Sequence, residues 1–372
     1  MRILLLGEYS NLHYTLAEAL RSLGHEVRLV SDGDDWKGYK QDVRLVRKST
    51  GRLDTLVYLA AVRREMRHWK GFDVVQLINP VHFIELKAER GIKIYDYLRK
   101  HNKKVFLGGF GDDYYYINDS YINRRLRYCD FYTPYHEVMH DWNRQNIDCW
   151  LHDEGMKRSC IHVADTCDGI IAALYEYYEA YRHVFPDKTT FIPLPIRCTQ
   201  DSEDNGNVIT AAEAKPIRFF IGIQKLRSAL KGTDLLLKVA KELEHQYPDK
   251  MQLVVAQNLP FDKYMELMST CDVLLDQIYS YTPAMNALQA MAHGIVAVSG
   301  GEEEQYDLLD EHVLRPIINV LPDETDIKQK LEQLILHPER LPELKRQSVE
   351  YVRRHHDAKK VAAQYVRFWQ QG

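Results

Sequence analysis

The sequence opens with MRILLLG at residues 1–7, continues with EYSNLHYTLAEALRSLG at residues 8–24, and then reads HEVRLVS at residues 25–31. The first run is short, largely apolar and ended by a glycine, which is typical of a buried parallel strand. The second run repeats leucine at helical spacing and closes on Gly24, a residue type that commonly ends helices. The third run predicts another strand, so the whole stretch predicts a β-α-β unit.

The same alternation continues toward the middle of the chain. Apolar runs predict strands at residues 72–78, 104–108 and 165–172, and periodic runs predict helices at residues 53–69, 92–100 and 175–184. Strands that alternate with helices in this way predict a parallel sheet covered by helices.

A polar stretch separates this half of the chain from a second one. Residues 197–214 contain QDSEDNGN and follow a segment with two prolines, which is typical of a linker. The alternation then restarts, with strands predicted at residues 217–221, 251–256, 272–275 and 295–299 and helices at residues 233–247, 261–270 and 283–293. We therefore predict an α/β protein with two doubly wound domains, at residues 1–196 and 216–354.

The composition fits a globular protein of this size. The 372 residues are 45% hydrophobic and 27% charged, and a domain usually takes about 100–200 residues. The formal net charge of −4 gives no sign of a nucleic-acid partner. No apolar run approaches the roughly 20 residues of a membrane helix, and the apolar start is too short for a signal peptide. The six cysteines show no CxxC spacing, so neither a zinc ribbon nor a redox pair is indicated. Together these features lead us to expect a cytoplasmic protein with reduced thiols.

Loops at the carboxyl ends of the strands are the expected ligand sites of such sheets. The first of them, GEYSN at residues 7–11, lacks the GxGxxG pattern of dinucleotide sites, and the chain has no GxxxxGK[ST] motif. Nicotinamide, flavin and P-loop chemistry therefore have no support from the sequence. The DGD at residues 32–34 resembles a metal-binding DxD, but its place directly after a strand favours an exposed turn.

A cationic loop in the second half is a candidate phosphate site. The strand that ends near Gly222 is followed by Lys225, Arg227 and Lys231, and Gly232 then opens a helix. Cations and the free amides of a helix N-terminus together suit a diphosphate. A solvated basic loop before a helix is the alternative.

The segment at residues 279–286 is a second candidate for the same ligand. Thr282 is placed to cap a helix that has Pro283 as its first residue. The amides of Ala284 and Met285 would then face an anion. A purely structural cap is the alternative.

Short motifs in a fixed order run through most of the chain. The second half carries KG at residues 231–232, CDV at 271–273 and QAMAHGIVA at 289–297. The first half and the C-terminus carry DVV at residues 73–75, GDD at 111–113, ADTCDGII at 164–171, IP at 192–193 and HDA at 356–358. In this order the motifs resemble family-4 glycosyltransferases, and residues 222–301 resemble the nucleotide-sugar half of that family.

The resemblance implies the GT-B fold, in which two Rossmann-like domains face a central cleft and a C-terminal helix, here about residues 355–372, returns to the N-terminal domain. It also implies an enzyme that moves a sugar, with retention of configuration, from a nucleoside-diphosphate sugar to a glycan or lipid-linked acceptor. The implied role is the synthesis of a surface polysaccharide or glycolipid. Neither a metal nor a cofactor is expected besides the nucleotide sugar.

The resemblance further implies roles for individual residues. Lys231, helped by Arg227, would neutralise the leaving diphosphate, and the amides at residues 282–285 would hold its other oxygens. Gln289 would offer a neutral partner to a ribose or sugar hydroxyl. The remaining donor-binding candidates are Gly222, Lys225 and Asn286.

Polar residues after the N-terminal strands are the candidates for the acceptor side. Glu8, Asn11 and His13 follow the first strand. Asp113 follows a later strand and is a candidate catalytic residue. Each has a structural alternative: solvation or capping for Glu8 and Asn11, a solvent-facing position for His13, and a fixed turn for Asp113.

A basic run, RREMRHWK at residues 63–70, is a candidate for contact with an anionic membrane. Such contact would hold the protein at the inner face of a membrane, where lipid-linked acceptors are found. A solvated helix end is the alternative.

Three functions are open at this point. The first is a retaining glycosyltransferase, the second another GT-B enzyme such as a sugar-nucleotide epimerase or a phosphorylase, and the third a catalytically weak sugar-nucleotide-binding protein. One departure from the family favours the third. The two glutamates that the family carries eight positions apart fall on Tyr281 and Gln289 here, so both carboxylates are absent.

Overall fold

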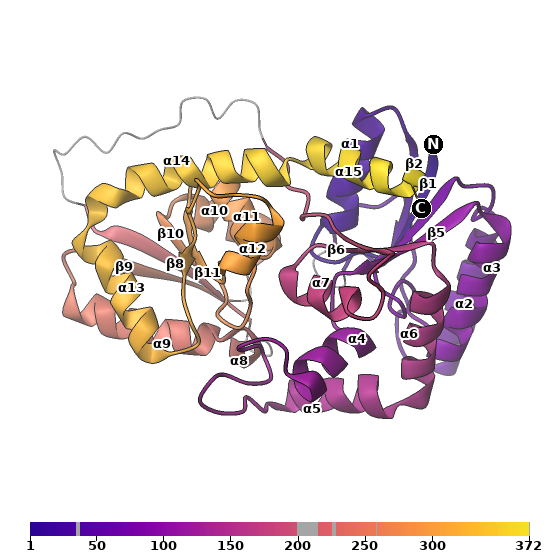
Figure 1. The fold of residues 1–372 in the computed structure, drawn as a ribbon, viewed down its shortest axis with the longest axis horizontal. Helices are drawn as coiled ribbons and strands as arrows, with labels where there is room; N and C mark the ends of the chain where they lie inside the picture. Colours follow the sequence, from indigo (N-terminus) through magenta and orange to yellow (C-terminus); the bar gives the residue numbers. More distant parts are fainter. Residues whose placement is uncertain (35–37, 199–214, 225–227, 258, 372) are drawn as a thin grey trace.

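The computed structural model describes residues 1–34, 38–198, 215–224, 228–257 and 259–371. A parallel sheet formed by the first half of the chain lies beside a second parallel sheet formed by the second half, and helices cover both sheets (Figure 1). The linker predicted at residues 197–214 lies almost wholly outside the described residues. The α/β class and the two-sheet arrangement agree with the sequence prediction.

The N-terminal sheet has the strand order β3-β2-β1-β4-β5-β6-β7, and neighbouring strands are parallel. β1 (Arg2–Leu6) pairs on both sides, and its side chains from Ile3 onward are at most 1% exposed. Burial on both faces explains why this strand is a continuous apolar run. The other strands are β2 (Glu26–Ser31), β3 (Val43–Arg44), β4 (Val74–Leu77), β5 (Lys104–Gly109), β6 (Gly169–Ala172) and β7 (Thr189–Phe191).

The C-terminal sheet has the strand order β12-β11-β10-β8-β9, again with parallel neighbours. A separate cluster of buried side chains, with Phe219, Leu236 and Leu331 among them, packs one face of this sheet against its helices. The strands are β8 (Ile217–Ile223), β9 (Met251–Gln257), β10 (Val273–Leu275), β11 (Val296–Ser299) and β12 (Ile318–Asn319).

Helices connect most of the successive strands of both sheets. Those of the first half are α1 (Leu12–Ser22), α2 (Arg52–Met66), α3 (Ala88–His101), α4 (Tyr114–Ile117), α5 (Asp141–Ile147), α6 (Glu154–Thr166) and α7 (Tyr175–Arg182). Those of the second half are α8 (Ser228–Lys231), α9 (Thr233–Gln246), α10 (Phe261–Ser269), α11 (Met285–Ala292), α12 (Glu303–Leu308), α13 (Glu324–Leu336), α14 (Leu341–Tyr351) and α15 (Ala358–Gln371).

The last helix returns to the N-terminal sheet, as predicted. α14 lies over the C-terminal sheet, and α15 continues from it to pack against α1 (Figure 1). The indole N–H of Trp369 donates to Oε1 of Gln76, on β4, at 3.2 Å. Where the chain crosses back, Ile196 N donates to the carbonyl of His356 at 2.7 Å.

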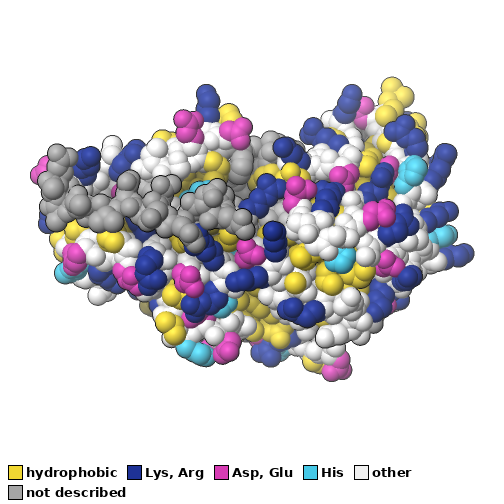
Figure 2. Space-filling model, turned by 90° about the horizontal axis from the view of Figure 1, so that it is seen from above, with side chains coloured by type: hydrophobic (Ala, Val, Ile, Leu, Met, Phe, Trp, Pro, Cys, Tyr) yellow, Lys and Arg dark blue, Asp and Glu magenta, His cyan; other side chains and the backbone are white. Residues whose placement is uncertain are grey.

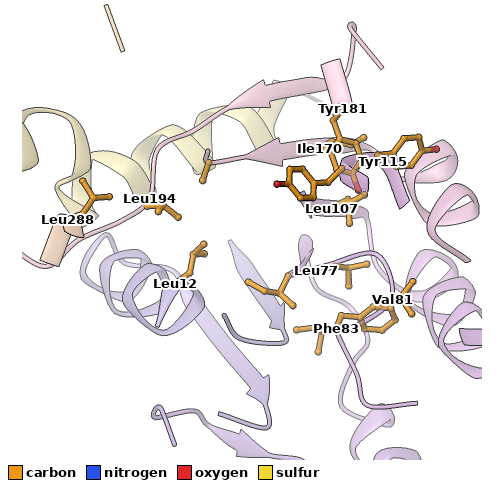
Figure 3. Close-up of a cluster of buried hydrophobic side chains, with 14 of the residues drawn as sticks. Leu12, Leu77, Val81, Phe83, Leu107, Tyr115, Ile170, Tyr181, Leu194 and Leu288 are labelled. Atoms are coloured by element: carbon orange, nitrogen blue, oxygen red, sulfur yellow. The ribbon is translucent and has the colours of Figure 1, made fainter. Parts of the chain in front are cut away.

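The hydrophobic core also continues between the halves. Figure 3 shows Leu288, from α11, beside Leu194 and Leu12 at one end of a buried cluster. The cluster then extends through Leu77 and Leu107 of the N-terminal sheet. The two sheets are therefore joined by buried apolar contacts as well as by the chain.

Candidate functional site

A cavity of about 540 Å³ lies in the N-terminal half, at the carboxyl ends of β1, β2, β4 and β5. This is the edge at which parallel sheets usually bind ligands. The loop Gly7–Ser10 forms one wall, and α5 with the turn after it forms another. The polar side chains of the lining include Glu8, Asp32, Asp34, Glu85, Asp112 and Asn146, and the aromatic ones include Tyr9, Tyr58, Phe110, Trp142, Trp150 and Tyr177.

Glu8 is the predicted acceptor residue that the structure places in this cavity. Its side chain is 3% exposed, and its two oxygens accept from the backbone N–H groups of Tyr14 at 2.8 Å and His13 at 3.2 Å. Burial raises the pKa of Glu8 to about 8, against the lowering effect of these two hydrogen bonds. At neutral pH the side chain is therefore mostly a neutral acid.

Asn11 and His13 do not line the cavity. His13 is fully buried, its Nδ1 lies 2.8 Å from the carbonyl oxygen of Gly7, and burial lowers its pKa to about 4. Asn11 precedes α1 in a left-handed conformation, and its side chain makes no capping hydrogen bond. His13 therefore supports the loop that carries Glu8 rather than lining the cavity.

Asp113 is also held away from the cavity. It is fully buried and caps α4, because its carboxylate accepts from Tyr116 N at 2.9 Å and from the Tyr181 hydroxyl at 2.7 Å. Burial raises the pKa of Asp113 to about 7. Asp113 therefore fixes the local backbone, which was its structural alternative, rather than facing the cavity. Its neighbour Asp112 lines the cavity instead.

The pair Asp32 and Asp34 was predicted to be an exposed turn, and the structure differs. Both residues line the cavity, and the carboxylate of Asp34 accepts from Ser10 N at 2.7 Å. This bond ties the loop after β2 to the loop after β1. The sequence spacing contained no sign of it, because residues 10 and 34 meet only when the two strands pair.

On the C-terminal side, the candidate donor residues lie around the start of α9. Lys231 ends α8, and its carbonyl accepts from Ile278 N at 3.1 Å. Gly232 has a φ of 68°, and a Cβ there would lie 2.2 Å from the Ile278 side chain, so glycine is required. Lys225 and Arg227, the other predicted cations, lie outside the described residues.

The predicted cap of α11 is wrong by two residues. The helix begins at Met285 with Ala284 before it, so Pro283 is not its first residue and Thr282 is not its cap. The Thr282 hydroxyl instead accepts from Tyr175 N at 3.0 Å and donates to Glu176 at 3.1 Å, both on α7. Contacts with the other half of the molecule have taken the place of a local cap.

Other donor-binding candidates have structural partners. Asn286 donates to Asp276 at 2.8 Å and accepts from the Tyr264 hydroxyl at 3.1 Å. Gly222 lies on β8, where a Cβ would meet the Tyr264 ring at 2.7 Å. Gln289 is half-buried on α11.

A polar contact between the halves surrounds Tyr281, one of the two positions that lack the family's glutamate. The Tyr281 ring is 1% exposed and stacks against Tyr128 and Tyr175, with ring centroids 4.9 and 5.3 Å apart. Its hydroxyl accepts from Arg127 N at 2.6 Å. Tyr281 therefore joins the two halves, a role that the family pattern did not indicate.

Charged groups extend this interface. The Arg127 guanidinium pairs with Glu302 at 2.7 Å and also with Glu304, and the Tyr128 hydroxyl donates to Glu302 at 2.7 Å. The buried carboxylate of Glu176 accepts from Tyr281 N and from the Thr282 hydroxyl. The Glu176 carboxylate thus contacts the start of the segment 282–285, which the sequence analysis proposed as an anion-binding segment.

A metal ion and a membrane are the two remaining partners that the sequence analysis considered. No cluster of three or more His, Cys, Asp or Glu side chains suited to a metal ion is found among them. In the same part of the chain, no helix combines the length and apolar character needed to cross a membrane.

Comparisons with known proteins agree with this architecture. Residues 218–367 match a family model described as glycosyl transferase-like. The search of curated proteins found no match. The matched residues begin in β8 and end within α15, so they contain Lys231, α9 and α11.

Solved structures resemble the whole chain at low sequence identity. Sucrose-phosphate synthase from Thermosynechococcus elongatus is 14% identical with a TM-score of 0.63, and the match covers 100% of this chain and 98% of the other. Anabaena Alr3699/HepE in complex with UDP-glucose is 13% identical with a TM-score of 0.58 and full coverage of both chains. WaaG, a glycosyltransferase of lipopolysaccharide biosynthesis, is 12% identical with a TM-score of 0.54, covering 97% of this chain and 98% of the other.

These likenesses confirm the GT-B fold and the predicted resemblance to GT-B glycosyltransferases. At such identities the structures carry information on the fold alone. The family model adds sequence-level support for the C-terminal part.

Proposed function

We propose that this chain transfers a sugar from a UDP-sugar to a hydroxyl group of an acceptor that binds in the N-terminal cavity. The observation that carries the proposal is the glycosyl transferase-like match over residues 218–367, in a chain with the GT-B fold. The choice of UDP is supported by the neighbour Alr3699/HepE, whose structures contain UDP or UDP-glucose. The resemblance to family-4 motifs supports retention of configuration.

In this proposal the donor diphosphate lies near Lys231 and the first amides of α11. Lys231 neutralises the charge of the leaving diphosphate, and the amides of Ala284, just before α11, and of Met285, its first residue, donate to its oxygens. The acceptor hydroxyl comes from the cavity beside Glu8. The departing diphosphate takes the proton, so no protein base is required, and no metal takes part.

The two competing functions are separated by the product. An epimerase would return a changed nucleotide sugar, whereas a transferase forms a glycosylated acceptor. A catalytically weak binding protein would form neither.

Replacing Lys231 with alanine is expected to abolish stabilisation by UDP. A ligand at 100 times its dissociation constant adds about 2.7 kcal/mol, which moves a melting temperature by several degrees. We would record melting curves with UDP, GDP, ADP and CMP. Of the four nucleotides, we expect only UDP to raise the melting temperature of the wild type. The melting temperature of K231A should not change with UDP.

Lys241→Ala is the matched control, since Lys241 is exposed on the same α9 helix. It should respond to UDP as the wild type does. A melting-temperature shift in K231A equal to that of the wild type would show that Lys231 does not contact the donor. If none of the four nucleotides shifts the wild type, the proposed function is contradicted. Once a donor and an acceptor are known, the anomeric configuration of the product by NMR tests retention.

We further propose that α2 brings the protein to the inner face of a membrane, where it adds sugars to a surface polysaccharide or glycolipid. Leu53, Leu56 and Val57 are 80%, 62% and 69% exposed on one side of this helix. The same side continues with exposed Arg63, Arg64 and Arg67. Residues three and four apart share one helix face, so apolar and basic groups form a single stripe.

The surroundings of the stripe are cationic as well. Exposed Arg44, Lys48, Arg52 and Lys70 lie in the same segment of sequence, whereas its acidic residues are covered: Glu65 is 9% exposed and pairs with Arg28, and Asp54 is half-buried. Figure 2 shows Lys and Arg side chains gathered at the end of the molecule that the N-terminal half forms. A chain with a net charge of −4 thus concentrates positive charge where apolar side chains protrude.

Changing both Arg63 and Arg64 to glutamine is expected to weaken binding to anionic vesicles about 30-fold. Each cation near an anionic surface contributes about 1 kcal/mol, and 1.4 kcal/mol is a factor of ten. Co-sedimentation with phosphatidylglycerol vesicles measures the change. The double variant Lys241→Gln/Lys328→Gln, exposed on α9 and α13, should bind as the wild type. Equal binding to neutral vesicles would contradict a charge-based contact.

A further inference from the structure

One carboxylate of the interface between the halves lies against the segment that would hold the donor. Glu176, in the first turn of α7, is 5% exposed. Its carboxylate accepts from Tyr281 N and, at 3.1 Å, from the Thr282 hydroxyl. The same hydroxyl accepts from Tyr175 N at 3.0 Å. Figure 1 shows α7 on the side of the N-terminal half that faces the C-terminal half, so this contact joins the two halves.

Hydrogen-bond donors surround Glu176, but no cation pairs with it. In the part of the chain that the structure describes, the arginines of this region pair with other carboxylates. Arg127 pairs with Glu302, and Arg182, on α7, pairs with Glu179. Burial raises the pKa of Glu176, whereas the hydrogen bonds that its carboxylate accepts lower it. The C-terminal half therefore supplies donors to the ionised carboxylate without neutralising its charge.

The donor would place a second negative group on the same segment. In the proposed function, the diphosphate oxygens accept from the amides of Ala284 and Met285, which closely follow Thr282. Consecutive Cα atoms are about 3.8 Å apart, so Thr282 and Ala284 are separated by at most about 8 Å. Like charges at a short separation repel each other, and solvent screens this repulsion little where the groups are buried. Binding of one anion therefore weakens the binding of the other.

From this arrangement we propose that Glu176 is an internal competitor of the donor: its carboxylate holds the segment 281–282 in the free protein and withdraws when a diphosphate binds to the amides that follow. The inference rests on the proposed function, because it concerns the regulation of that donor site. The contact is then an autoinhibitory latch, which keeps α7 on the C-terminal half until the donor binds. Part of the binding free energy of the donor is used to release Glu176.

Removing the charge of Glu176 should therefore tighten UDP binding, whereas damage to the fold would weaken it. The variant Glu176→Gln keeps the size of the side chain, and we expect its dissociation constant for UDP to be about tenfold lower than that of the wild type. Isothermal titration calorimetry of the full chain at low ionic strength measures both constants. Glu242→Gln, at an exposed position on α9, is the matched control and should bind UDP as the wild type does.

Two comparisons separate the charge of Glu176 from its fit in the interface. Glu176→Asp keeps a carboxylate, so it should bind UDP no more tightly than the wild type. Uridine carries no phosphate, so Glu176→Gln should not tighten its binding. The inference is overturned if Glu176→Gln binds UDP no more tightly than the wild type. It is also overturned if Glu176→Asp gains as much affinity for UDP, or if Glu176→Gln gains as much for uridine.

The wild type provides a second measurement, which also applies if Glu176→Gln does not fold. UDP should release α7 from the segment 281–282, so the backbone amides of Tyr175–Arg182 should exchange hydrogen faster with UDP than without it. Unchanged or slower exchange in the presence of bound UDP would contradict the latch.

These outcomes distinguish the inference from the proposed function. If UDP binds neither the wild type nor Glu176→Gln, the proposed function fails, and the inference fails with it. If UDP binds the wild type and Glu176→Gln equally well, the proposed function stands and only the inference fails.

Discussion

The variant Tyr281→Ala is expected to lose about 3–5 kcal/mol of folding free energy, the usual cost of deleting a buried aromatic side chain. Tyr281 is 1% exposed and lies between two further tyrosine rings, so the deletion leaves a void lined by Tyr128 and Tyr175. The main-chain N–H of Arg127 also loses its acceptor at 2.6 Å. Urea unfolding curves measure the change as a lower transition midpoint.

The shape of the transition should change as well. Tyr281 belongs to the C-terminal half, whereas Arg127, Tyr128 and Tyr175 belong to the N-terminal half. Removing the ring therefore weakens the coupling between the halves, and we expect the thermal transition to broaden or split in two.

Two variants test this interpretation. Tyr281→Phe keeps the stacked ring and removes only the hydroxyl acceptor, so it should cost about 1–3 kcal/mol, the penalty for an unpaired polar group. Tyr135→Ala changes a tyrosine that is 75% exposed and should lie within about 0.5 kcal/mol of the wild type. A Tyr281→Ala protein as stable as Tyr135→Ala would show that the halves do not meet at this ring in solution.

The parts of the fold that sequence could predict are those fixed by local patterns. Strands such as Arg2–Leu6 are buried on both faces, so their sequences are unbroken apolar runs. The returning helix was expected from the family resemblance alone, and the face of α15 that contains Val361, Tyr365 and Trp369 does pack onto the N-terminal sheet.

Residues 114–152 are one segment for which the sequence predicted no element. This segment contains short helices and π-helical turns, which are too brief for a sustained apolar period. It nevertheless supplies Trp142 and Trp150 to the cavity and Arg127 and Tyr128 to the interface with the other half. These contacts join residues far apart in sequence, so neither spacing nor propensity indicates them.

The candidate site shows the same limit at the level of single residues. The GDD motif lies in a loop that borders the cavity, but which of its two aspartates faces the cavity depends on the helix that follows. Asp113 caps α4 and turns inward, and Asp112 is left on the cavity side. Similarly, a threonine before a proline is a reasonable helix cap, yet the Thr282 hydroxyl donates a hydrogen bond to Glu176 of the other half.

The second large effect concerns Glu8 and pH. Its pKa is about 8 in the folded chain, against 4.5 for an ordinary glutamate. Between these values the unfolded chain has released the proton and the folded chain retains it. Stability is therefore lost as pH rises from about 4.5 to about 8, about 5 kcal/mol in total at about 1.36 kcal/mol per unit of pKa difference.

Glu8→Gln removes this loss, because an amide does not titrate. At pH 5 we expect the variant to be slightly less stable than the wild type, since one of the N–H groups of His13 and Tyr14 loses its acceptor. At pH 8 we expect it to be more stable by a few kcal/mol. Urea unfolding of both proteins at pH 5, 6, 7 and 8 measures the difference.

Other buried carboxyls do not obscure this comparison. Burial also raises the pKa values of Asp113 and Asp130 to about 7, but both proteins contain these residues, so their effects cancel in the difference. Glu242→Gln, at an exposed position on α9, should show a constant difference from the wild type across the same range. A constant difference for Glu8→Gln would mean that Glu8 is ionised in the folded chain.

The expected gain at pH 8 also bears on why a glutamate occupies this position. A buried acid that lowers stability at neutral pH is costly unless it has a task, and polar groups that destabilise the fold concentrate at functional sites. If the cavity binds the acceptor, Glu8→Gln should stabilise the chain and weaken acceptor binding in the same protein. A stabilised variant with unchanged acceptor binding would instead limit Glu8 to holding the loop between β1 and α1 through His13 and Tyr14.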